Sequence, residues 1–148
     1  GEGNEESEVT TAAQQQDPIS WVRIDPDMEW CAEIRLAQPD VQWIEQLEHD
    51  RDVVAQSDAV AALARLPSEA ACTALEKTAA DYRAVWGVRK AAVRALAEAA
   101  SSAACGWSGM RRLVDGLYLR RFGVRDGGDL VPRPNNFENL QQYYLLLG

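Results

Sequence analysis

Residues 59–64 read AVAALA and residues 92–97 read AVRALA, so one apolar pattern returns after about 33 residues. Each copy stands at the end of a predicted helix pair. A pattern that returns at a regular interval of this kind indicates helix pairs stacked in a row, which is the architecture of an α-solenoid. Because alanine-rich helices match one another easily, an irregular helix bundle stays open as the alternative.

Helical spacing of apolar residues continues on both sides of this repeat, from Asp40 to the end of the chain. Asp40, Asp52 and Ser68 are predicted to cap the first three helices, and the second of these ends at Leu66-Pro67. A fourth helix has an apolar face and, within residues 88–96, the pattern of an inner helix of a HEAT repeat. Its apolar face holds Val85, Val88, Ala92, Leu96 and Ala99.

Two further helices are predicted towards the end of the chain. One begins near Ser108 and is expected to bury Met110, Leu113, Val114 and Leu117. The other follows Asn135-Asn136 and has Phe137, Leu140, Tyr144 and Leu147 on its apolar side. The fold class predicted for residues 39–148 is therefore mostly α, as the start of a longer HEAT-like solenoid.

A different periodicity precedes these helices. Residues 21–24 approximate an apolar–polar alternation, Asp25-Pro26-Asp27 forms a turn, and residues 30–36 alternate with period two, as a half-buried strand does. Two such strands predict a hairpin. Because an isolated hairpin is marginally stable in water, residues 18–38 are expected to complete a sheet whose other strands lie upstream.

The first residues and the overall composition indicate a piece of a longer, globular, intracellular protein. Residues 1–17 contain five acids, no base and no aromatic residue, which predicts a flexible acidic linker. The chain begins with Gly1 rather than methionine, and it has neither a membrane-spanning run nor a signal segment. Cys31, Cys72 and Cys105 are far apart and fit a reducing compartment, with burial expected for each.

Motifs for catalysis and for cofactor binding are missing from the sequence. It has no HExxH pair, no glycine-rich phosphate loop and no GxSxG elbow. His49 is the only histidine, and the acids around Asp25 lack the spacing of a calcium loop. We therefore predict no enzyme activity, no catalytic residue, no metal site and no cofactor.

Positive charge is concentrated in the second half of this acidic chain. Residues 83–125 contain nine bases and two acids, although the formal net charge of the chain is −8. These bases form a candidate face that would bind phosphate or an acidic partner. The alternative is that the arginines are solvated or form ion pairs within the solenoid. The candidate residues are Arg89, Lys90, Arg94, Arg111, Arg112, Arg120 and Arg121.

Longer blocks of the chain resemble one known family. The blocks WVRIDPDMEW at residues 21–30 and QLEHDRDVVAQ at residues 46–56, with shorter matches as far as Tyr143-Tyr144, are similar to the transcription initiation factor TFIID subunit 2 family. The resemblance covers residues 20–148. The motif residues expected to have structural roles are Trp21, Arg23, Asp25, Pro26, Trp30, Trp43, Arg51, Asp52 and Gln56.

The resemblance implies a fold related to zinc aminopeptidases but without a working peptidase site. Residues 18–38 would then close an aminopeptidase-like, β-sandwich-like module, and the HEAT-like array would follow. The implied role is a nuclear, non-catalytic scaffold of TFIID that supports assembly of the RNA polymerase II preinitiation complex at core promoters. The implied partners are TFIID subunits 8 and 1, TATA-binding protein within the complex and promoter DNA, with no membrane.

Two other hypotheses stay open at this point. The chain could be a C-terminal accessory domain of an active zinc aminopeptidase, which predicts a HExxH segment in the longer protein. Alternatively, the basic helices bind DNA directly, which predicts an affinity that falls steeply with salt concentration.

Overall fold

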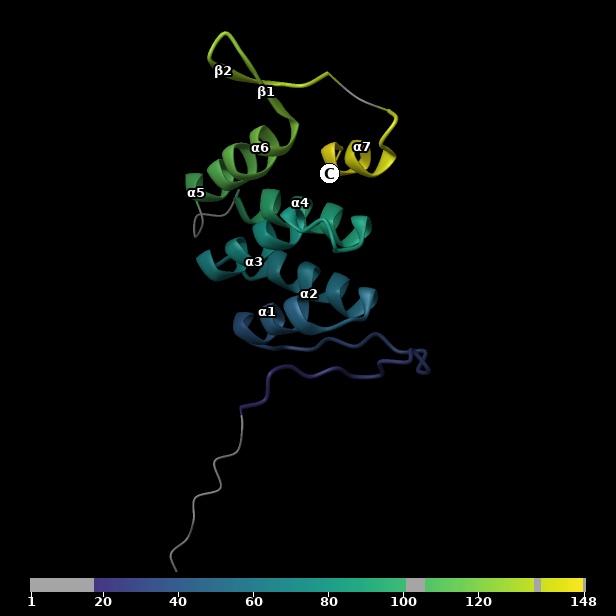
Figure 1. Ribbon diagram of the computed structural model, residues 1–148. Helices are drawn as coiled ribbons and strands as arrows, with labels where there is room; N and C mark the ends of the chain where they lie inside the picture. The colour runs from purple at the N-terminus through teal and green to yellow at the C-terminus, as the bar shows by residue number, and fades with distance from the viewer. Residues whose placement is uncertain (1–17, 101–105, 135–136, 148) are drawn as a thin grey trace, which may run out of the picture.

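The computed structural model describes residues 18–100, 106–134 and 137–147 of the chain, so the acidic linker predicted over residues 1–17 lies outside the described residues. Four helices form the central stack: α1 (Asp40–His49), α2 (Val53–Arg65), α3 (Glu69–Ala80) and α4 (Trp86–Ala100). They stack in chain order as two pairs, α1 with α2 and α3 with α4, and the rest of the described chain lies beyond α4 (Figure 1). The mostly α fold class and the stacked arrangement are as predicted.

Two of the three predicted helix caps are present. The Asp52 side chain accepts a hydrogen bond from the backbone N–H of Val54 at the start of α2, at 2.9 Å. Ser68 accepts one from the N–H of Ala71 at the start of α3, at 3.1 Å. The prediction for Asp40 is wrong, because Pro39 is the cap residue and Asp40 is the first helical residue. Its carboxylate instead accepts a hydrogen bond from the Ser68 hydroxyl at 2.8 Å, which ties the starts of α1 and α3 together.

The core lies between the stacked helices and consists mainly of alanine and leucine. Ala59, Ala71 and Ala92 have no exposed surface, and neither do Leu63 and Leu96. Alanine at these positions lets neighbouring helices approach closely, while the leucines fill the remaining space at interior density. The two alanine-rich repeats therefore form one continuous core, as their sequence predicts.

Beyond α4 the chain forms one uninterrupted helical run made of three parts: α5 (Gly106–Arg111), the π-helix η1 (Arg112–Tyr118) and α6 (Leu119–Phe122). Arg112 joins this run to α3, since its guanidinium lies 2.9 Å from the carboxylates of both Glu69 and Glu76. Of the predicted apolar face, Leu117 is buried and Leu113 is partly buried. Met110 and Val114 are exposed, so the prediction of their burial is wrong.

A small antiparallel hairpin follows, made of β1 (Gly123–Asp126) and β2 (Asp129–Pro132). Its turn needs glycine, because Gly127 and Gly128 have φ values of 58° and 102°, in the region that other residues rarely adopt. The sequence analysis did not predict this hairpin, although Asp126-Gly127-Gly128-Asp129 is a recognised hairpin signal.

The last helix, α7 (Leu140–Leu146), lies against α4 at the far end of the stack (Figure 1). Asn139 caps it by accepting a hydrogen bond from the N–H of Gln142, whereas Asn135-Asn136 lie outside the described residues. The buried residue of α7 is Leu145, and the predicted apolar face is exposed. That prediction is wrong: Tyr144 does contact α4, with its ring centroid 5.6 Å from that of Trp86, but it stays 41% exposed, and the side chain that becomes buried is Leu145.

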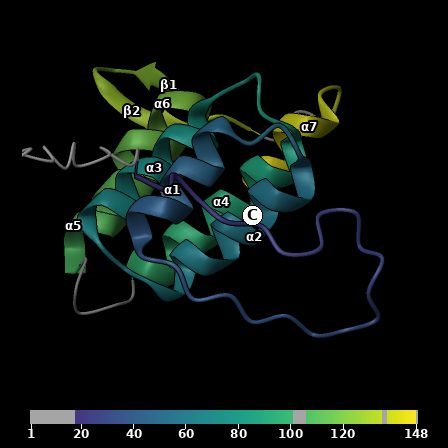
Figure 2. The same ribbon diagram turned by 90° about the horizontal axis from the view of Figure 1, so that it is seen from below.

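Residues 18–38 form an extended segment that crosses the end of the stack next to α1 and α2. Part of it forms a wide loop that stands away from the helices, as the view from below shows (Figure 2). No strand pairing occurs within residues 18–38, so the predicted hairpin is not formed. The physical reason is that two short strands without further partners bury too little apolar surface to hold a sheet together.

Within the described ranges, no helix is both long and apolar enough to cross a membrane.

Candidate functional site

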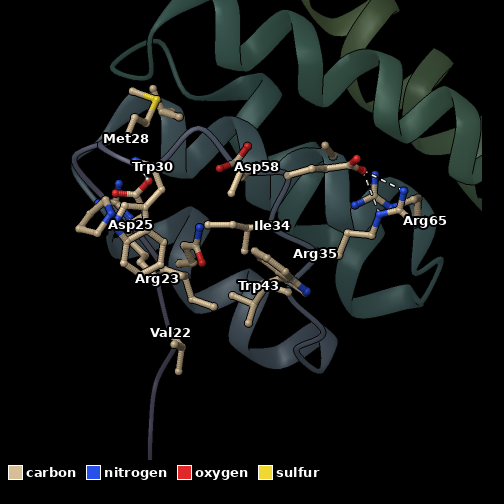
Figure 3. Close-up of a pocket in the computed structure, with 18 residues that line it drawn as sticks. Val22, Arg23, Asp25, Met28, Trp30, Ile34, Arg35, Trp43, Asp58 and Arg65 are labelled. Atoms are coloured by element: carbon tan, nitrogen blue, oxygen red, sulfur yellow. Dashed lines mark hydrogen bonds and ion pairs between the residues drawn. The ribbon is translucent and has the colours of Figure 1, made fainter.

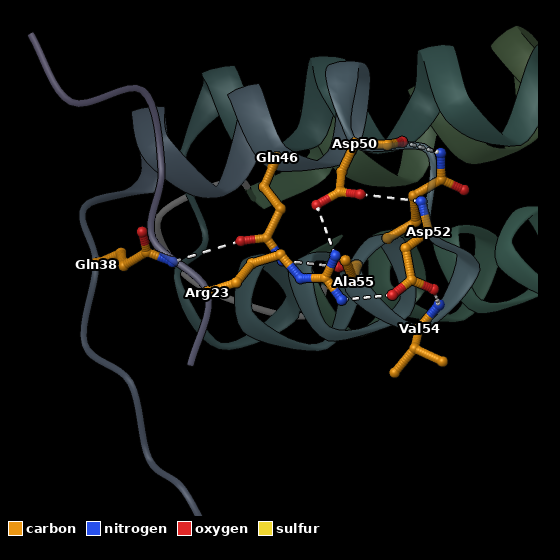
Figure 4. A network of polar contacts seen from close by, with 8 residues as sticks. Arg23, Gln38, Gln46, Asp50, Asp52, Val54 and Ala55 are labelled. Carbon is orange, nitrogen blue, oxygen red and sulfur yellow. Dashed lines mark hydrogen bonds and ion pairs between the residues drawn. The ribbon is translucent and has the colours of Figure 1, made fainter. Parts of the chain in front are cut away.

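The candidate site is the joint between the extended segment and the first two helices, and Arg23 is its centre. The Arg23 guanidinium forms ion pairs with Asp52 and, at 3.5 Å, with Asp50 in the loop between α1 and α2 (Figure 4). Asp52 thus caps α2 and binds Arg23 at the same time. The hydrogen bond from Val54 N–H, followed by the hydrogen bond and charge of Arg23, lowers the pKa of the Asp52 carboxyl below its ordinary value.

Glutamine side chains extend the joint from the loop into α1 and α2. Gln38 accepts a hydrogen bond from the backbone N–H of Val22 at 2.8 Å, and its own amide lies 3.5 Å from the side-chain oxygen of Gln46. Gln46 in turn donates to the carbonyl of Ala55 in α2 at 2.9 Å (Figure 4). Because Gln38 and Gln46 are buried, each needs these partners, and their geometry holds the segment in one position.

Two further contacts tie the ends of the joint. Gln42 of α1 donates a hydrogen bond to the carbonyl of Ile19 at 3.1 Å, and Gln56 of α2 donates to the carbonyl of Asp50 at 2.8 Å. The segment is therefore attached near its beginning by Gln42 and Arg23 and at its end by Gln38.

Between these attachment points the segment encloses a groove of about 1020 Å³ against α1 and α2. Trp43 and Ile34 lie inside it, and Asp58 and Arg65 of α2 lie along its side (Figure 3). The volume is at the upper limit of small-molecule pockets and suits a peptide segment better than a metabolite. The charged side chains that line the groove are of both signs and come from the extended segment and from α2: Arg23, Asp25, Glu33, Arg35, Asp58 and Arg65.

The turn at the open end of the groove is held by its own side chain. Asp25 has a φ of 51°, and its carboxylate accepts hydrogen bonds from the N–H groups of Glu29 and Trp30, both at 2.9 Å. Pro26 follows inside the turn, while Met28 and Trp30 project into solvent. Exposed side chains of this size on a well-anchored turn are typical of a contact surface.

The nine family-motif residues gather mostly at this joint. Arg23, Asp52 and Gln56 form its polar contacts, Trp43 is a buried residue of the groove lining, and Trp21 is half-buried. Asp25, Pro26 and Trp30 form the turn, whereas Arg51 is exposed in the loop. Gln38, Gln46 and Asp50 were not predicted, and no sequence pattern distinguishes a buried glutamine from an exposed one.

The seven predicted basic residues do not share one surface. Arg89 is buried and donates to the carbonyl of Ala79 at 3.1 Å, and burial, followed by the charge of Arg121, lowers its pKa. Arg112 is held by Glu69 and Glu76, and the hydrogen bond to Glu76 is the main reason that its pKa is raised. Arg94, Arg111 and Arg120 are exposed, Lys90 is half-buried, and Arg121 is half-buried with its Nε atom buried and unpaired.

The residues considered for catalysis do not come together. His49 is exposed and lies 3.3 Å from Glu45 on the same helix, Cys72 is buried, and Cys105 lies outside the described residues. Cys31 is exposed, so the prediction that it is buried is wrong. The described residues contain no cluster of histidine, cysteine and acid that fits a metal ion. Among the described residues these side chains form no reactive constellation.

Two family models match this chain, and they meet at the joint. Residues 1–39 match the family model of the TAF2 Ig-like domain, and residues 40–147 match the model described as TAF2-like, TPR repeats. The boundary between the two models falls at Pro39, where the extended segment meets α1. The helical part therefore corresponds to repeats described as TPR rather than HEAT.

Relatives from distant organisms are about one third identical to this chain. Transcription initiation factor TFIID subunit 2 of Drosophila melanogaster is 34% identical over 141 residues, which is 95% of this chain and 11% of the relative. The protein of that name from Gallus gallus is 35% identical over 142 residues, covering 95% of this chain and 12% of the relative. The one from Schizosaccharomyces pombe is 35% identical over 130 residues, covering 86% and 11%.

This chain spans about one ninth of the length of these relatives. The helical-repeat model covers most of its residues, and the identity holds across insects, birds and yeast. The chain belongs to the transcription initiation factor TFIID subunit 2 family.

Proposed function

We propose that this chain is a non-catalytic scaffold segment of the general transcription factor TFIID, in which it holds a β-module at a set angle to a helical-repeat array. The observation that carries the proposal is the joint, in which Arg23, Gln38 and Gln46 attach the extended segment to α1 and α2. A polar network of this kind fixes one geometry, because each buried group is satisfied in only one arrangement.

The β-module in this proposal is the one to which residues 18–38 belong. Those residues match an Ig-like family model but contain too few strands for a sandwich, which typically needs about 100 residues. Their alternating side chains fit strands that pair with others elsewhere in the longer protein. We also propose that this β-module is related to the aminopeptidase fold.

The wider role follows from family membership. In the nucleus the subunit would support assembly of the RNA polymerase II preinitiation complex at core promoters, in contact with TFIID subunits 8 and 1 and with TATA-binding protein in the complex. Promoter DNA is a further candidate contact, through the exposed Arg94, Arg111 and Arg120. The name that the relatives share supports membership of TFIID, and the individual contacts are inferred from the family resemblance.

Affinity capture of the full-length protein from nuclear extract, with crosslinks mapped by mass spectrometry, tests this role. We expect crosslinks from residues 20–148 to other TFIID subunits and no peptidase activity in the captured complex. Capture without any TFIID subunit, together with aminopeptidase activity, would contradict the proposal.

A matched pair of variants tests the joint itself in the same experiment. Arg23→Glu places a negative charge against Asp50 and Asp52, whereas Arg35→Glu changes an exposed residue of the same segment whose ion pair is with Glu33. We expect Arg23→Glu to shift crosslinks between the β-module and the helices, and Arg35→Glu to leave them in place. If the two variants have the same effect on these crosslinks, the joint does not set the angle between the β-module and the helices.

A further inference from the structure

Two arginine side chains, one on α4 and one on α6, have buried donors without a partner. Arg89 of α4 is only 5% exposed, and its Nη2 atom is buried with no hydrogen-bond partner in the described part of the chain. The Nε atom of Arg121 on α6 is buried and unpaired in the same way. Figure 1 shows α6 directly beyond α4 in the stack. We call Arg89 and Arg121 the arginine pair.

The two members of the arginine pair carry the same charge and act on each other. Burial is the main reason that the pKa of Arg89 is lowered, and the positive charge of Arg121 lowers it further. An unpaired buried charge is costly, and a like charge beside it adds repulsion that water screens poorly in the interior. Such an arrangement is stable when a negative group pairs with both cations.

The contact that Arg89 makes within the stack explains only part of this arrangement. Its Nε atom donates to the carbonyl of Ala79 at 3.1 Å, and that carbonyl is one of those that the end of α3 leaves without an intrahelical partner. A neutral donor such as a glutamine amide would satisfy this carbonyl without burying a charge. The contact therefore does not account for the Nη2 atom of Arg89 or for the presence of Arg121.

The acid that acts on the arginine pair is Asp81, and it does not complete the site. Its charge raises the pKa of Arg89, less strongly than burial and Arg121 lower it. The Asp81 side chain is exposed and accepts a hydrogen bond from the backbone N–H of Arg83 at 2.9 Å. None of the ion pairs within the described ranges includes Arg89 or Arg121. Even with the charge of Asp81 counted in full, one positive charge of the pair is left over.

We infer that the arginine pair binds one carboxylate, supplied by an Asp or Glu side chain from outside residues 18–147. Arg89 Nη2 and Arg121 Nε are the two donors that this carboxylate would accept from, and guanidinium groups bind carboxylates strongly. A single negative charge matches the excess, whereas a phosphate monoester carries up to about two. A DNA duplex is excluded from a guanidinium that is buried between helices. The inference goes beyond the proposed joint, because the arginine pair lies on other helices.

Carbodiimide coupling tests this inference and identifies the source of the carboxylate. Arg121→Lys keeps the positive charge and places an amine at the site, and the carbodiimide joins this amine to a contacting carboxylate as an amide, with loss of water. The variant is prepared as the full-length protein and as the complex captured from nuclear extract. We expect an amide between position 121 and one Asp or Glu outside residues 18–147. Arg125→Lys, at an exposed position of β1, is the matched control and should not give this product.

The products distinguish the possible sources. The amide within the purified full-length protein would mean that another part of the same polypeptide supplies the carboxylate, and the amide in the captured complex alone would mean that a partner does. An amide to Asp81 would overturn the inference, because the acid already present would then complete the site. Absence of a product above the Arg125→Lys control would also overturn it, since water or a free anion would then satisfy the two donors.

Hydrogen exchange in the captured complex provides a second test, in which the sign of the effect decides. If a carboxylate bridges the pair, Arg121→Gln removes one of its two partners, and we expect exchange in α4 to become about tenfold faster. If no carboxylate is bound, the same substitution removes a like charge from beside Arg89, and exchange in α4 would slow or stay unchanged. Arg125→Gln is the control and should have no effect on α4.

These results are independent of the test of the proposed function. A captured complex that contains TFIID subunits but gives neither the amide nor faster exchange would overturn the inference and leave the scaffold role in place. The amide in a capture without TFIID subunits would do the reverse.

Discussion

At the scale of single residues, a few polar side chains each bind two partners and so connect different parts of the chain. Asp52 caps α2 and holds Arg23 of the extended segment, and Arg112 holds Glu69 and Glu76 two turns apart on α3. Substituting such a residue removes two interactions at once and leaves both partners without their hydrogen-bonding or ionic counterpart.

Acid should weaken the joint at Asp52. The pKa of the Asp52 carboxyl is lowered in the folded state, so at acid pH the unfolded chain binds a proton there more readily than the folded chain does. The contribution of Asp52 to the free energy of unfolding is therefore present above about pH 4 and is lost as the pH falls further. We expect Asp52→Asn to reduce this acid dependence, whereas Asp58→Asn, an exposed position on α2, keeps it. Urea unfolding midpoints measured between about pH 7 and pH 3 test the expectation, and equal slopes for the two variants would contradict it.

Arg112 should contribute more to stability than its neighbour. Arg112→Met removes two ion pairs between η1 and α3 and is expected to cost about 1 kcal/mol, the upper range for partly exposed pairs. Arg111→Met, at an exposed position with no ion pair among the described residues, should cost much less. Thermal unfolding of both variants in low and high salt is the measurement, and the difference between them should shrink as salt increases.

At the scale of elements, helix ends and tight turns follow local chemistry closely. Asp52, Ser68 and Asn139 start three helices by accepting a hydrogen bond from the first turn, and Gly127-Gly128 make the turn of the hairpin. These features depend on residues within a few positions of one another, which is why sequence patterns identify them well.

Ser68 and Ser57 form a matched pair for testing the caps. Ser68→Ala removes the cap of α3 and its bond to Asp40, and should cost about 1 kcal/mol. Ser57→Ala removes only a bond to the carbonyl of Val53 inside α2 and is expected to be neutral or slightly stabilising, because alanine favours the helix. Chemical unfolding of the two variants tests this order, and an equal loss would mean that the cap at Ser68 is not used.

At the scale of the whole molecule, stability is shared through one core that runs along the stack. Leu63 of α2 is completely buried among residues of the neighbouring helices, whereas Leu66, three positions on, is largely exposed. In stacked repeats each helix pair is stabilised by its neighbours, so a defect in the centre spreads to both sides.

Leu63→Ala should therefore weaken several helices at once. We expect a loss of about 2–5 kcal/mol, the usual cost of a leucine-sized cavity, with faster hydrogen exchange in α1, α3 and α4 as well as in α2. Leu66→Ala is the control and should change little. Faster exchange confined to α2 would show that the helices unfold independently.

The sequence by itself determined the helical class, the positions of α1 to α4, two of the caps and the family. It did so because helical spacing, capping and the repeated alanine pattern are local properties that each stretch of chain carries alone. It also pointed to Arg23, Asp52 and Trp43, through motif blocks rather than through a physical argument.

Only the tertiary structure decided which helix faces are buried and which charged side chains form contacts within the stack. Leu145 rather than Tyr144 is buried, Arg89 and Arg112 serve inside the stack, and residues 18–38 stay unpaired. A short helix such as α7 has apolar residues on more than one side, and an arginine carries the same charge wherever it lies. The physical reason is that burial and pairing depend on which neighbours arrive from distant parts of the chain, and only the packing of the stack brings those neighbours together.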